Sequence, residues 1–84
     1  MASKDKIDEI ISMLAELEED ATVPKNVKLK VREVIKTLKE DKESSIKVNE
    51  ALNDLDEIAD DTNVQPYTRT QLYGVVSLLE KVKD

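Results

Sequence analysis

The chain repeats its apolar pattern after 41 residues, and this repeat constrains the fold more than any other feature of the sequence. Within each half the apolar residues recur at i, i+3, i+4 and i+7, which places them on one face of a helix. Each half therefore predicts two amphipathic helices that bury their apolar faces together. When the sequence is aligned with itself at that offset, the matching apolar pairs are Ile7/Val48, Ile10/Ala51, Ile11/Leu52, Leu14/Leu55, Leu17/Ile58, Val23/Val64, Val31/Leu72, Val34/Val75, Ile35/Val76 and Leu38/Leu79.

Helix boundaries follow from the capping residues and the two prolines. Ser3 and Ser44 are suited to N-cap positions, and so are Thr22 and Asn63, which align in the repeat. Proline is tolerated in a first helical turn because the N–H groups there lack intrahelical partners. The expected helices run from about Lys4 to Asp20, from Val23 or Pro24 to Glu40, from Ser45 to Asp60, and from Gln65 to Lys83.

The link between the two halves is the short polar segment 41–44. Short connections make successive helices antiparallel neighbours. The sequence therefore predicts a single all-α domain over residues 1–84, an up-and-down four-helix bundle built from two repeated αα-hairpins at about 3–43 and 44–84. An open pair of solenoid repeats is the alternative, but solenoids generally need about three repeats for stability.

Residue types that the chain lacks exclude several kinds of chemistry. It has no Cys and no His, so it lacks thiolate ligands, cysteine nucleophiles and the usual general base. Its only glycine, Gly74, cannot form a phosphate-binding loop. No apolar stretch approaches the length of a membrane span, and the N-terminus lacks the apolar region of a signal peptide. We expect a cytoplasmic protein that is not an enzyme, does not contact a membrane, and holds no cofactor or metal.

The two halves differ in charge. Residues 1–42 carry nine Lys or Arg against ten Asp or Glu, whereas residues 43–84 carry four against nine. In the first half, Lys25, Lys28, Lys30 and Arg32 follow the acidic end of the first helix and are expected to neutralise it across the hairpin turn. In the second half only Arg69 is available to balance the carboxylates between Asp54 and Asp61.

This imbalance leads to the main functional hypothesis, a helical module that presents an acidic surface to a basic protein partner. The residues expected to bind the partner are Asp54, Glu57, Asp60, Asp61, Tyr67 and Arg69. A solvated acidic face that only aids solubility is the simpler interpretation. A divalent metal site at Asp54, Glu57 and Asp61 is a third, although a regular helix holds carboxylates too far apart and too rigidly for calcium.

A different class of function uses the basic start of the second helix. Lys28 and Arg32 are spaced at i, i+4 and could contact phosphates of RNA, as in a ribosome-associated accessory factor. The net charge of −6 makes nucleic acid an unexpected partner.

Weak self-association is a further alternative, because it could bury Leu29, Tyr67 or Leu78. Gly74 either allows another helix to approach closely or is simply tolerated.

The two turns that contain proline, 20–27 and 60–67, together with the surrounding four-helix pattern, carry a resemblance. Over essentially its full length the chain resembles the short acidic archaeal proteins grouped as uncharacterised protein family 0147. The resemblance implies an all-α four-helix bundle and an archaeal cytoplasmic setting. It implies no activity and no functional residues.

Overall fold

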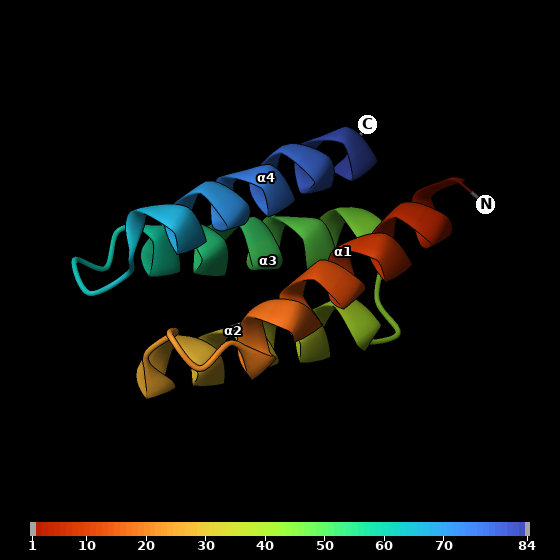
Figure 1. Ribbon diagram of the computed structural model, residues 1–84. Coiled ribbons are helices and arrows are strands. Elements are labelled where there is room, and N and C mark those ends of the chain that lie inside the picture. Colours follow the sequence, from red (N-terminus) through yellow and green to blue (C-terminus); the bar gives the residue numbers. More distant parts are fainter. Residues whose placement is uncertain (1, 84) are drawn as a thin grey trace.

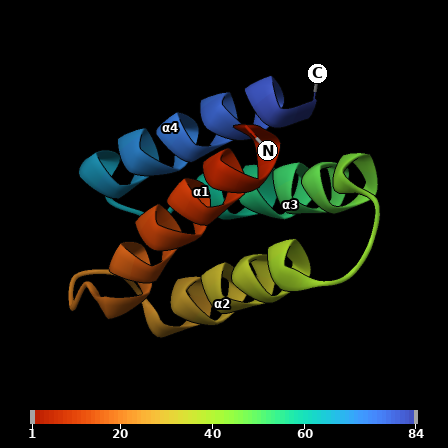
Figure 2. The same cartoon turned by 90° about the vertical axis from the view of Figure 1, so that its right-hand side faces the viewer.

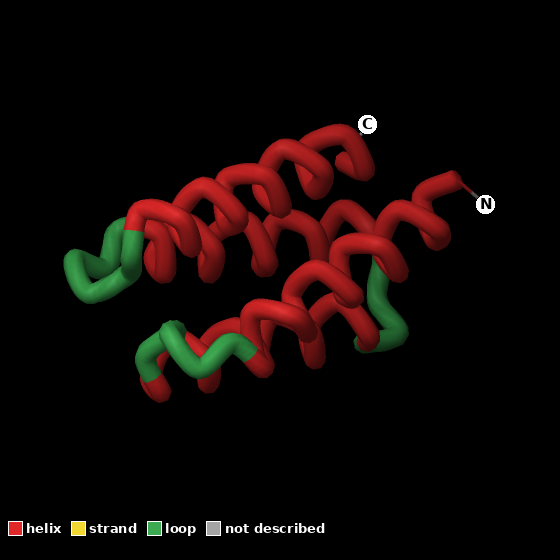
Figure 3. Tube along the Cα trace, in the orientation of Figure 1, coloured by secondary structure: helices red, strands yellow, loops and turns green. Residues whose placement is uncertain are grey.

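Four helices run alternately up and down and are joined by short connections in the computed structural model, which describes residues 2–83 (Figure 1). They are α1 (Ala2–Glu19), α2 (Lys25–Lys39), α3 (Ser44–Ala59) and α4 (Pro66–Lys83). The α1–α2 and α3–α4 turns lie at one end of the molecule, and the α2–α3 connection lies at the other (Figure 3). The all-α, up-and-down arrangement predicted from the repeat is confirmed.

The two hairpins close on each other rather than forming an open pair. α1 packs against α2 and α4, and α3 packs against the same two helices, so each helix has two neighbours (Figure 2). The radius of gyration is 11.9 Å. This agrees with the value of about 12 Å expected for a compact domain of this length. The apolar stripes therefore meet in one central core.

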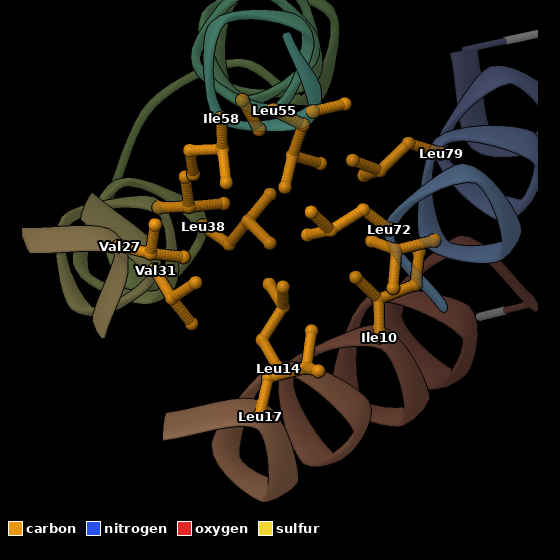
Figure 4. Close-up of a cluster of buried hydrophobic side chains, with 14 of the residues drawn as sticks. Ile10, Leu14, Leu17, Val27, Val31, Leu38, Leu55, Ile58, Leu72 and Leu79 are labelled. Carbon is orange, nitrogen blue, oxygen red and sulfur yellow. The ribbon is translucent and has the colours of Figure 1, made fainter. Parts of the chain in front are cut away.

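Most of the repeated apolar positions lie in that core (Figure 4). Eight of the ten aligned pairs are buried in both halves. The other two pairs, Ile11/Leu52 and Ile35/Val76, are half-buried and pack against the edge of the core. Both members of each pair take the same intermediate position, so the repeat in sequence is also a repeat in packing.

Thr68 is a buried residue that the apolar pattern does not predict. It is 2% exposed and lies among the core residues at the start of α4. At the 41-residue offset it aligns with Val27, which is 1% exposed in α2. Threonine and valine have nearly the same shape, so the second half keeps the packing and changes only the polarity.

Several predicted helix ends are wrong by one or two residues, and the predicted caps differ. Ser44 is the first residue of α3, and Glu43 takes the N-cap position without a side-chain hydrogen bond. α2 begins at Lys25 with Pro24 as its N-cap, again without such a bond. Ser3, predicted as a cap, lies within α1. The first turns of α2 and α3 are thus held by backbone hydrogen bonds to Pro24 and Glu43 rather than by side-chain caps.

Gly74 lies on the exposed side of α4. A Cβ added there would meet no atom within 4 Å outside the local backbone. Close approach of another helix of the bundle therefore does not explain this glycine. A glycine in the middle of a helix destabilises it by about 1 kcal/mol relative to alanine, and packing within the bundle does not offset this loss.

Candidate functional site

The two hairpin turns share one hydrogen bond from a backbone N–H to an aspartate at the 41-residue offset. The Oδ1 atom of Asp20 accepts bonds from the Thr22 backbone N–H at 2.9 Å and from the Thr22 hydroxyl at 2.7 Å. The Oδ1 atom of Asp61 accepts a bond from the Asn63 backbone N–H at 2.8 Å. Thr22 and Asn63, predicted as capping residues, therefore donate to the turn instead. The bonds from Thr22 lower the pKa of the Asp20 carboxyl.

Arg69 holds the α3–α4 turn together through backbone carbonyls. Its Nε donates to the carbonyl oxygen of Ala59 at 2.9 Å, and its Nη2 donates to those of Asp61 at 3.0 Å and Val64 at 3.3 Å. A guanidinium at the C-terminal end of a helix also interacts favourably with the helix dipole. Arg69 was predicted as a partner-binding residue, but its donors are directed into the turn, so we leave it out of the candidate surface.

An acidic row follows the side of α3 that faces α2. It consists of Glu50, Asp54, Glu57 and Asp61, spaced at i, i+4, i+7 and i+11. Two contacts from α2 fix its position: Lys30 Nζ lies 4.0 Å from Glu57 Oε2, and Asn26 Nδ2 donates to Asp61 Oδ2 at 3.3 Å. Lys30 therefore pairs with the second half rather than with the end of α1, which corrects the expectation for that residue.

Asp54 lies at the centre of the acidic row with no ion-pair partner among the described residues. Partial burial and the nearby carboxylates of Glu57, Glu33 and Glu50 raise the pKa of the Asp54 carboxyl, and Lys30 offsets this only in part. Glu50 could have been placed here from its helical spacing. Glu33 could not, because its position depends on how α2 and α3 pack.

Tyr67 is separate from the acidic row. The two residues Tyr67 and Arg69 are about 200° apart around the helix. Because Arg69 reaches the end of α3, Tyr67 points away from α3, and it is 68% exposed. The C-cap residue of α3, Asp60, is exposed at the end of the row. The structure thus places Asp54, Glu57, Asp60 and Asp61 on α3 and its C-terminal turn, and it separates them from Tyr67.

The basic start of α2 borders a hollow of about 480 Å³. The lining residues are Glu18, Lys25, Lys28, Leu29 and Arg32. Arg32 Nε lies 2.6 Å from Glu18 Oε1, which confirms the predicted neutralisation across the first turn for this pair. With Arg32 and Lys30 both paired to carboxylates, Lys25 and Lys28 are the two cations at this end of α2 without an ion pair among the described residues.

A second hollow, of about 370 Å³, lies at the opposite end of the bundle. It is lined by Ile7, Asp8, Ile11, Leu38, Lys39, Ser44 and Lys47, a mixture of apolar and oppositely charged groups. Within residues 6–82 no three acidic side chains are grouped so that they could hold a metal ion. Nor is any helix in that range long and apolar enough to cross a membrane.

Relatives with similar sequences come from archaea. The UPF0147 protein MJ1419 of Methanocaldococcus jannaschii is 42% identical over 74 residues, which cover 84% of this chain and 77% of the relative. A UPF0147 protein of Sulfurisphaera tokodaii is 35% identical over 80 residues, covering 94% and 90%. The crystal structure of MMP1188, a protein of unknown function, superposes with a TM-score of 0.90 at 39% identity, covering 96% of this chain and 93% of that one. The model of the uncharacterised protein family UPF0147 matches residues 1–82. The chain therefore belongs to the uncharacterised protein family UPF0147, as its turns and core pattern indicated.

Proposed function

We propose that the chain is a non-enzymatic interaction module that binds a basic segment of a partner protein along the acidic row of α3. The observation that carries the proposal is the environment of Asp54. Its carboxylate lies near three others and forms no ion pair with the side chains of residues 6–82. A Lys or Arg of a partner would supply the missing counter-ion, so binding would relieve a repulsion that the folded chain bears alone.

The ion pairs around the acidic row indicate which part of it a partner would bind. Lys42 contacts Glu50 at one end of the row and Lys30 contacts Glu57 next to the other end, and neither forms an ion pair with Asp54. A partner with two or three basic side chains at helical or extended spacing would match the open centre. Pairs of this kind on an exposed surface contribute mainly to the association rate and to specificity, so we expect weak binding that depends on salt.

A titration of the isotope-labelled protein with a lysine-rich peptide tests this proposal. Backbone amide shifts are expected along α3, between residues 50 and 61. The double variant Asp54→Asn, Glu57→Gln should weaken the binding. The matched control Asp8→Asn, Glu9→Gln removes the same charge from exposed positions of α1 and should bind the peptide as the unmodified protein does. Equal weakening by both double variants would show that only net charge matters and would contradict the proposal.

The basic hollow at the start of α2 favours a second candidate, an RNA- or ribosome-associated accessory factor. Lys25 and Lys28 border the hollow together with the exposed Leu29. The same labelled protein titrated with a short single-stranded RNA would distinguish the two. Shifts confined to the start of α2, lost in the Lys25→Ala, Lys28→Ala variant, would favour RNA over a basic protein partner.

A further inference from the structure

The outer face of α4 differs from every other exposed helix face in this molecule. Between Gln65 and Ser77 none of its exposed residues carries a charge. The one charged residue in that stretch is Arg69, which is half-buried and bonded to the turn. The exposed sides of α1, α2 and α3 all carry several charges, as expected for a chain with 38% charged residues. An uncharged face on such a chain requires an explanation beyond solubility.

Both tyrosines of the chain lie on this outer face. Tyr67 is 68% exposed and Tyr73 is 54% exposed, so neither contributes mainly to the core. Gly74 lies beside them, where a side chain would meet open space. Tyrosine is enriched where proteins bind one another, because it buries a large area with few rotatable bonds. A glycine on an exposed helix face lets a second backbone come close.

The spacing along this face matches a helix packed against another helix. Counting from Tyr67, the residues at steps of three and four are Thr70, Gly74, Ser77 and Lys81. Such steps keep a stripe of side chains facing a neighbouring helix over several turns. The stripe has its large residues, Tyr67 and Lys81, at its ends and its small residues in the middle.

We propose that this face of α4 binds a second copy of the chain, with the two α4 helices antiparallel and crossing at Gly74. A two-fold axis at Gly74 places Tyr67 of one copy opposite Lys81 of the other, because both lie seven residues from the glycine. A lysine ammonium over a tyrosine ring is a favourable pair. Thr70 and Ser77 meet near the crossing, where their small side chains allow the backbones to approach.

The stripe fits a second copy because it is complementary to itself about the two-fold axis, with Tyr67 opposite Lys81. Each copy carries a net charge of −6, so two copies repel across most of their surfaces. This repulsion is least along α4 between Gln65 and Ser77, where no exposed residue carries a charge. A basic partner would instead be attracted to the carboxylates of α3.

The size of the face sets the expected affinity. α4 has 18 residues and is therefore about 27 Å long. One helix pair of that length falls at the low end of the area that specific interfaces bury. We therefore expect a dimer that dissociates in the range of about 10 µM to about 1 mM.

Sedimentation equilibrium of the full chain across that concentration range tests the proposal. The unmodified protein should shift from monomer to dimer. Gly74→Glu and Gly74→Lys each place two like charges at the crossing and should stay monomeric. Both substitutions have open space and higher helix propensity than glycine, so circular dichroism should show an intact fold. An equimolar mixture of these two variants should associate, because opposite charges then meet.

The control is Asn49→Glu, which adds the same charge at an exposed position of α3 and should dimerise as the unmodified protein does. Three results would overturn the proposal: an unmodified protein that stays monomeric across the range, a Gly74→Glu variant that dimerises normally, or an Asn49→Glu variant that is weakened as much as Gly74→Glu. The first of these would leave the face to an unrelated protein or to no partner.

Discussion

Replacement of Arg69 by alanine tests whether one side chain holds the α3–α4 turn. Its guanidinium donates three hydrogen bonds, to the carbonyl oxygens of Ala59, Asp61 and Val64. A hydrogen bond from a charged donor is worth about 1.5–3 kcal/mol when well placed, and neutral ones about 1 kcal/mol. The side chain is half-buried, and the Asp61 carbonyl also accepts a bond from the Val64 N–H. We therefore expect the free energy of unfolding to fall by about 2–4 kcal/mol, less than the sum of three bonds.

The repeat supplies a matched control for this experiment. Lys28 occupies the position of Arg69 in the first half, at the same offset of 41 residues. It makes no side-chain hydrogen bond or ion pair among the described residues. Lys28→Ala should therefore change the free energy of unfolding by no more than about 0.5 kcal/mol. The two substituted residues occupy equivalent positions in the two hairpins, and only Arg69 donates hydrogen bonds to backbone carbonyls.

Urea unfolding followed by circular dichroism measures both variants. Arg69→Ala should lower the midpoint without changing the slope, since the loss is in native contacts rather than in buried area. In a domain of this size the loss corresponds to a fall in melting temperature of roughly 10–25 °C. If Arg69→Ala and Lys28→Ala lose the same small amount, the carbonyl bonds do not stabilise the turn and our interpretation of Arg69 is wrong.

The remaining predictions concern protonation and one buried hydroxyl. Asp54→Asn should stabilise the protein at pH 7 but not at pH 3. The raised pKa means that the folded chain disfavours the charged Asp54 carboxyl. This penalty is absent at low pH, begins as pH rises above the ordinary carboxyl pKa of 3.8 and is complete above the folded pKa; equal stability gains at both pH values would contradict this. Asp20→Ala should lose stability at pH 7. The bonds from Thr22 lower the pKa of the Asp20 carboxyl, so the stability they contribute is fully present above the ordinary carboxyl pKa of 3.8 and is lost as pH falls through the folded pKa. The difference from the unmodified protein should therefore shrink in acid unfolding curves. Thr68→Val should change the free energy of unfolding by no more than about 1 kcal/mol in urea unfolding, because valine fills the equivalent site in α2; a larger loss would mean that the hydroxyl has an essential partner.

The fold could be predicted because its main determinant is a periodic pattern. Leu14, Leu55 and their neighbours recur at helical spacing. The face that a helix buries depends on this spacing more than on which apolar residue occupies each position. Thr68 was missed because a polar residue breaks the apolar pattern, although its alignment with Val27 could have found it. Helix starts were less accurate, because the predicted side-chain caps do not form and Pro24 and Glu43 take the N-cap positions without them.

The candidate site was only partly predictable from the sequence. The charge excess around Asp54 and Glu57 is visible in the sequence, and the structure confirms that these residues lie on one side of α3. The contacts of Lys30 and Arg69 were not predictable. Lys30 reaches the neighbouring hairpin because α2 lies against α3, and Arg69 turns toward backbone carbonyls that no sequence pattern marks. A long side chain can reach several possible partners, and tertiary packing determines which of these contacts forms.

The packing of α4 between α1 and α3 has a consequence for folding during translation. α4 is made last of the four, and it fills the space between α1 and α3. Until it leaves the ribosome, the earlier helices expose the apolar residues that it will cover, such as Ile10 and Leu55 (Figure 4). A nascent chain of three helices is therefore the species most prone to aggregate. This exposure ends when Leu72 and Leu79 emerge and close the bundle.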